Sequence, residues 1–158
     1  MQAFATKINE QGKLAGLPSP FVFSGSGKVG ASWNADRLVS YAGEVEARKG
    51  QEQRGLQDRV AEELNRAYNL DCRDVSDDEV LADIGTSLGI FTSQDEAKSW
   101  LQSDAHEYEV KHKLQMVQNN GVQSVPFYIV NDGADHLSET GDKETFLRMF
   151  RMAVANYK

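Results

Sequence analysis

Three groups of residues have types and spacings that could support chemistry, and the first is a glycine-rich loop. Gly25, Gly27 and Gly30 match the GxGxxG pattern of a dinucleotide-binding loop. Such a site needs a strand before the loop, a helix after it, and then a second strand that ends in an acid. A short apolar segment, residues 21–23, precedes the loop, but the segments after it are helical and polar. The sequence therefore favours an ordinary loop.

The second group consists of His106, Glu109 and His112, which are spaced three residues apart. This spacing places them near one face of a helix. A zinc site normally uses a histidine pair four residues apart and further ligands as well. We expect a solvated, charged helix face here and no metal site.

The third group is Cys72, the single cysteine of the chain. One cysteine can form neither an internal disulfide nor a CxxC redox pair, which favours a reducing compartment such as the cytoplasm. A cysteine becomes a nucleophile as the thiolate, which a helix N-terminus or a neighbouring cation favours. Arg73 is adjacent and a helix is predicted shortly after it, so Cys72 is a candidate catalytic residue. The sequence favours the alternative, that Cys72 is an unreactive cysteine between two helices.

The elements that would position these residues are mostly helices. Apolar residues recur at helical spacing in residues 3–14, 34–48, 57–68 and 104–118. The sequences Ser76–Glu79 and Ser93–Glu96 are capping boxes, in which the serine caps the third helical N–H. They predict helices over residues 76–89 and 93–101.

The C-terminal part combines strands with one helix. Pro126 stands at the mouth of a short apolar strand, a position where its missing N–H is tolerated. A turn at 131–133, a weak strand at 136–138 and a helix that begins at Asp142 follow. In the helix over 104–118 we expect Val110, Leu114 and Val117 to face inward. The fold class is therefore α+β and helix-rich, in one domain over 1–158 with a change from helices to hairpin near residue 120.

Composition limits the class of partner. The chain has 158 residues, 40% hydrophobic and 26% charged, with a net charge of −7. This balance fits a soluble domain and argues against nucleic acid or an anionic membrane as partner. No apolar run reaches the roughly 20 residues of a membrane helix, and the N-terminus lacks the apolar core of a signal peptide.

Four segments, in this order, resemble the DsbA-like thioredoxin-fold family, in particular its FrnE branch with the 2-hydroxychromene-2-carboxylate isomerases and kappa-class glutathione transferases. They are ASWNADRLVSYA (31–42), LNRAYNLDCRDVSDDEVLADIGTSLGI (64–90), GVQSVPFYIVND (121–132) and DHLSETGDKETFLRMF (135–150). The resemblance implies a partial thioredoxin-like fold with a helical insertion and a C-terminal β-hairpin plus helix. It also implies a cis peptide bond before Pro126.

The chain departs from this family at the positions that carry its chemistry. The family begins with a strand and a helix that bears CxxC or a serine, and nothing in this sequence corresponds to them, so we expect a chain that lacks that N-terminal part. The family's histidine in the motif "AHRL" is Asp36 here. The resemblance implies that Ser124, Val125 and Pro126 offer an open backbone edge to a small molecule or a thiol ligand such as glutathione.

Three functions stay open at this point. The first is ligand binding at the Pro126 loop, with non-redox isomerase or transferase activity. The second is thiol-disulfide exchange by an active-site half that lies outside this chain. The third is a non-catalytic, dimeric interaction protein. Because a bare hairpin edge promotes aggregation, we expect residues 21–23, a second copy or a partner chain to cover it.

Overall fold

The computed structural model describes residues 2–16, 30–122, 126–130, 135–137 and 143–156. They form two compact units, Met1–Val110 and Lys111–Lys158, which we treat separately. The division falls inside helix α6 (Glu107–Asn119), before the change that the sequence predicts near residue 120.

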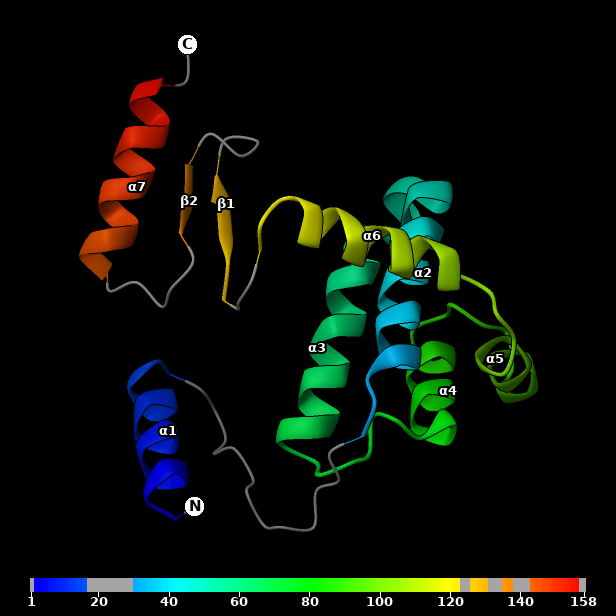
Figure 1. Cartoon of the computed structure of the whole chain (residues 1–158). Helices are drawn as coiled ribbons and strands as arrows, with labels where there is room; N and C mark the ends of the chain where they lie inside the picture. Colours follow the sequence, from blue (N-terminus) through cyan, green and yellow to red (C-terminus); the bar gives the residue numbers. More distant parts are fainter. Residues whose placement is uncertain (1, 17–29, 123–125, 131–134, 138–142, 157–158) are drawn as a thin grey trace. The chain divides into compact units, whose positions relative to one another are not determined.

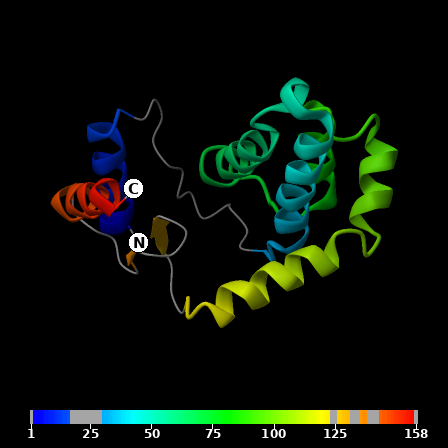
Figure 2. The ribbon, with the colours of Figure 1, turned by 90° about the horizontal axis from the view of Figure 1, so that it is seen from above.

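The N-terminal unit is helical. Its elements are α1 (Gln2–Leu14), α2 (Trp33–Lys49), the 3₁₀ turn η1 (Gly50–Gln53), α3 (Leu56–Asn69), α4 (Asp78–Ser87), α5 (Gln94–Leu101) and the start of α6. The predicted helices are confirmed to within three residues at each end. Helix α2 packs against α3 and α4, and α4 packs against α5 (Figures 1 and 2).

The core of this unit lies where α2, α3 and α4 meet. Each helix contributes one apolar stripe, as expected from the 3.6-residue period. The side chains that are fully or almost fully buried are Leu38, Ala42 and Val45 of α2, Leu56 and Val60 of α3, and Leu81 and Ala82 of α4. The aromatic rings of Tyr41, Phe91 and Trp100 pack beside this core, with centroids 4.9–5.9 Å apart.

Two glycines mark close approaches of helices to side chains. A Cβ added to Gly85 of α4 would lie 2.7 Å from Cδ2 of Phe91, whose ring is buried. A Cβ added to Gly43 of α2 would lie 2.9 Å from Oε1 of Gln57. The first obstacle is a packed ring and the second is the end of a flexible side chain.

The helix N-termini confirm one predicted cap and correct the other. Ser93 accepts a hydrogen bond from the N–H of Glu96 at 3.2 Å, as its capping box predicts. At α4, however, the cap is Asp77, which accepts from the N–H of Glu79 at 2.9 Å. Ser76 lies one residue before the cap, and both its N–H and its hydroxyl donate to the carboxylate of Asp74. Both residue types cap well, and the helix begins one residue later than the capping box predicts.

Helix α3 is capped from a neighbouring helix. Its N-cap residue, Gly55, has φ +74° and no side chain to offer. The carboxylate of Glu46 in α2 takes that role, accepting from the N–H of Gly55 at 2.8 Å and of Gln57 at 3.2 Å. The two N–H groups, that of Gly55 first, lower the pKa of Glu46 below its ordinary value of 4.5.

This cap predicts a pH-dependent effect of Glu46→Gln. Because the pKa is lowered in the folded state, the ionised carboxylate stabilises the fold above pH 4.5, and this contribution is lost as the pH falls through the folded-state pKa. We expect Glu46→Gln to lower the melting temperature at neutral pH, and the difference from wild type to shrink below pH 4.5. Thermal unfolding across this range, with exposed Glu62→Gln as control, checks it; a difference that does not change with pH contradicts the cap.

The C-terminal unit contains a strand pair and a helix. Strands β1 (Tyr128–Val130) and β2 (Asp135–Leu137) are antiparallel, with Ile129 opposite His136. Helix α7 (Lys143–Asn156) places the ring of Phe146 edge-on to Tyr128, with centroids 4.9 Å apart. Figure 1 shows α7 (red) beside the strand pair (orange).

The prediction that Leu114 and Val117 of α6 face inward is wrong. Val110 is buried, but Leu114 and Val117 are 50% and 45% exposed. Of these three predicted inward positions, only Val110 is therefore buried. In β1, Ile129 is 59% exposed. Residues 21–23, the expected cover, lie outside the described residues, so coverage of the strand edge stays a prediction.

Candidate functional site

The N-terminal unit contains a pocket of about 400 Å³ between α2, α3 and the loop before α4. This volume lies within the usual range for small-molecule sites. Its lining combines aliphatic, aromatic and polar side chains: Gly30, Ser32, Ala35, Asp36, Val39, Ala61, Leu64, Asn65, Tyr68 and Val75.

Helix geometry explains why these residues meet. The lining positions of α2 and its N-cap are 32, 35, 36 and 39, and those of α3 are 61, 64, 65 and 68. Both sets follow the spacing i, i+3, i+4, i+7, which places residues on one face of a helix. The pocket is therefore the space between two facing stripes. Leu38 of α2 and Val60 of α3 border these stripes and are buried in the core.

The polar groups of the pocket are already oriented. The hydroxyl of Ser32 donates to Oδ2 of Asp36 at 3.0 Å, so Ser32 holds this carboxylate instead of capping the helix. The side-chain amide of Asn65 donates to the carbonyl of Ala61 at 2.9 Å. The pocket thus presents a carboxylate and a phenol, that of Tyr68, beside an apolar floor.

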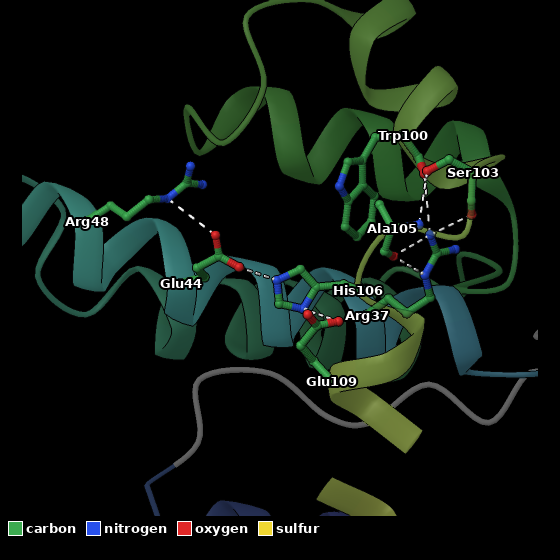
Figure 3. Close-up of polar contacts among 8 residues, drawn as sticks. All are labelled: Arg37, Glu44, Arg48, Trp100, Ser103, Ala105, His106 and Glu109. Atoms are coloured by element: carbon green, nitrogen blue, oxygen red, sulfur yellow. Dashed lines mark hydrogen bonds and ion pairs between the residues drawn. The ribbon is translucent and has the colours of Figure 1, made fainter. Parts of the chain in front are cut away.

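The residue after Asp36 lies on a different face of α2. Arg37 is 2% exposed and reaches the C-terminal end of α5 and the loop that follows (Figure 3). Its guanidinium donates to the carbonyls of Leu101 at 3.0 Å, Ser103 at 2.7 Å and Ala105 at 2.7 and 2.9 Å, with a longer contact to Trp100. Carbonyls at a helix C-terminus carry partial negative charge, which favours a cation there.

Asn34 extends this network to α4. Its amide donates to Asp78 at 3.0 Å, and its oxygen accepts from Arg37 at 2.8 Å. The first turn of α2 therefore joins the start of α4 to the end of α5. These contacts fix the turn that carries Ser32 and Asp36.

The prediction of a solvated face is confirmed for Glu109 and His112, which are exposed, but it is wrong for His106. His106 precedes α6 with φ +62°, and its side chain is only 9% exposed. Its Nε2 lies 2.6 Å from Glu44 and its Nδ1 3.9 Å from Glu109 (Figure 3). The ring packs edge-on to Tyr41. His106 thus joins the loop before α6 to α2 through its contacts with Glu44 and Tyr41.

No group of three or more residues of the metal-ligand types His, Cys, Asp and Glu occurs with suitable geometry within the described ranges. In the same ranges, no helix combines the length and the apolar character that crossing a bilayer requires.

The comparison with protein families decides the classification. The model of the DSBA-like thioredoxin domain matches residues 1–149, nearly the whole chain. The chain belongs to the DSBA-like thioredoxin domain family. The comparison with curated proteins gives no match.

The residues that the sequence singles out for this DSBA-like chain lie in different places. Pro126 is half-buried just before β1, in the C-terminal unit, whereas Ser124 and Val125 lie outside the described residues. Cys72 is half-buried in the loop between α3 and α4. The cation beside it, Arg73, is engaged by Asp83 at 2.6 Å. The roles proposed for these residues stay predictions.

Of the glycine-rich loop, only Gly30 is described. It lies against the loop before α4, where a Cβ would overlap the side chain of Ser76. This close packing accounts for the last glycine of the pattern without a nucleotide.

The sequence did not predict the pocket of the DSBA-like chain. Ala61, Leu64 and Tyr68 belong to the helical spacing predicted over residues 57–68, and in the structure Ala61 and Leu64 are half-buried and Tyr68 is 41% exposed. The sequence feature that could have indicated the pocket is a polar residue within the apolar stripe of each helix, Asn65 on α3 and Asp36 on α2. Such a mixture of polar and apolar residues is the usual composition of a ligand site.

Proposed function

We propose that this chain is a small-molecule-binding member of the DSBA-like family, of the FrnE and isomerase-like branch, that acts without a dithiol of its own. The observation that carries the proposal is the pocket between α2 and α3, with its oriented carboxylate and apolar floor. Pockets that combine an apolar surface with a few placed polar groups are the usual form of ligand sites.

The single cysteine supports the same proposal. Dithiol exchange needs two cysteines, and the 158 residues contain one. Within this chain, chemistry that depends on a bound organic ligand, such as isomerisation or group transfer, is the better match. Glutathione is a further candidate ligand, for the segment with Pro126, on the strength of the family resemblance alone.

A pocket-filling variant tests ligand binding. Ala61 is half-buried and lines the pocket, so Ala61→Phe places a ring in it, whereas Ala47→Phe adds the same ring at an exposed position of α2. The probe is indole, a neutral aromatic, in an ¹⁵N-HSQC titration. A fragment of this size binds with a Kd of about 1 mM.

We expect indole to shift the amides of Asp36, Val39 and Tyr68 in wild type and Ala47→Phe. In Ala61→Phe the binding weakens about tenfold, since the volume is occupied. Wild-type spectra without shifts at these amides contradict the pocket as a ligand site. If glutathione shifts only amides near Pro126, the site lies in the C-terminal unit instead. Disulfide reduction by this chain alone contradicts the non-redox part.

A further inference from the structure

Charge is unevenly distributed around the pocket. Asp36 is the one charged residue among its described lining residues, which include no Lys, Arg or His. A second carboxylate stands at the edge, because a Cβ on Gly30 would lie 3.1 Å from Oδ1 of Asp74. A concave surface lined by one sign of charge attracts ligands of the opposite sign.

The carboxylate of Asp36 is suited to receive a donor. It lies in the first turn of α2, where the helix dipole favours a negative charge. Ser32 occupies one acceptor position on Oδ2. An ionised carboxylate has about four such positions, so Asp36 retains acceptor capacity, and the residue is exposed.

The arginines next to the lining residues in sequence are directed elsewhere. Arg37 is buried and donates to carbonyls at the end of α5. Arg66, which follows Asn65, pairs with Asp71 at 3.7 Å. These cations therefore do not neutralise the pocket by direct contact with Asp36.

Resting on the proposed function, we infer that the ligand of this pocket is an organic cation, an amine with a small apolar or aromatic body. The ammonium group binds the Asp36 carboxylate. The body lies on Val39 and Leu64, and the ring of Tyr68 adds an aromatic face that attracts a cation. The inference concerns the charge of the ligand, which the proposed function leaves open.

Three probes that share one body separate this inference from ligand binding in general. 2-Phenylethylamine is a cation at neutral pH, 2-phenylethanol is neutral and 3-phenylpropanoate is an anion. All three are titrated into the full chain by ¹⁵N-HSQC at low salt. We expect the amine to bind about fivefold more tightly than the alcohol, and the acid most weakly. Added salt weakens amine binding alone.

The variant Asp36→Asn keeps the shape and removes the charge. We expect it to reduce the affinity for the amine to that for the alcohol, about a fivefold loss, with the alcohol unaffected. The control is Asp58→Asn, which removes an exposed first-turn carboxylate of α3 outside the pocket. It changes amine affinity less than about twofold.

The outcomes distinguish ligand binding by the pocket from a preference for a cation. If none of the probes shifts the pocket amides, the proposed function fails and the inference fails with it. If the alcohol or the acid binds as tightly as the amine, ligand binding stands and the cation inference is wrong. Equal losses in Asp36→Asn and Asp58→Asn assign the preference to the net charge of the chain, which also overturns the inference. The wild-type order of the probes decides the question if Asp36→Asn fails to fold.

Discussion

We expect replacement of Arg37 by Met to lower the free energy of unfolding of the N-terminal unit by about 3 kcal/mol. The methionine fills a similar volume but donates no hydrogen bond, so the carbonyls of Leu101, Ser103 and Ala105 lose their partner. A buried acceptor left unpaired, as at Leu101, costs about 1–3 kcal/mol, the two part-buried carbonyls cost less, and removal of the buried charge offsets part of the sum.

The measurement is chemical unfolding followed by tryptophan fluorescence. Both tryptophans, Trp33 and Trp100, belong to the N-terminal unit, so the signal reports on that unit. Arg37→Lys keeps the charge but not the planar fork of donors, and we expect it to lose about 2 kcal/mol. Exposed Arg59→Met is the control and stays within about 0.5 kcal/mol of wild type. A loss below about 1 kcal/mol for Arg37→Met contradicts the assigned role.

The second large effect is expected for Gly85→Ala, which we expect to lower the free energy of unfolding although helix propensity alone would raise it. Alanine in a helix gains about 1 kcal/mol over glycine. Here the new Cβ would meet Cδ2 and Cε2 of Phe91 at 2.7 and 2.8 Å. That ring is 4% exposed and packed against Tyr41 and Trp100, so it cannot withdraw. Overpacking costs typically 1–3 kcal/mol and sometimes more, and we expect a net loss of about 2 kcal/mol.

Gly43→Ala is the matched test of this explanation. It is also a helical glycine with a short contact, but the contact is with the side-chain amide of Gln57, which can rotate away. We expect no loss and a gain of up to about 1 kcal/mol. The same fluorescence-detected unfolding compares both variants. Equal destabilisation by the two variants would mean that the rigidity of the contacting side chain, Phe91 or Gln57, does not determine the change in stability.

Local patterns predicted the helices well because each helix buries one stripe of its own sequence. The spacing in residues 57–68 is an example, and it recovers α3 within a residue at each end. The cap of α5 was also predictable, because Ser93 and Glu96 are three residues apart. The cap of α4 was not, because Ser76 and Asp77 are adjacent and both residue types suit that role, and the structure places the cap at Asp77.

The features that depend on residues far apart in the sequence could not be predicted. The carbonyls that bind Arg37 lie 63–68 residues away, and a charged side chain in a helix is normally expected in solvent. The turn at His106 depends on a left-handed backbone that spacing cannot show. The pocket needs two stripes, on α2 and α3, to face each other, and their lining residues carry no pattern in common beyond helical spacing.

Asp36 and Arg37 are neighbours in the chain that lie on different faces of α2. Arg37 holds the end of α5, while Asp36 faces the pocket and touches only its own N-cap among the contacts described for its carboxylate. Under the proposed function, a change at position 36 is therefore expected to alter what the pocket accepts without disturbing the contacts of Arg37. Specificity can diverge at this position while the scaffold is retained.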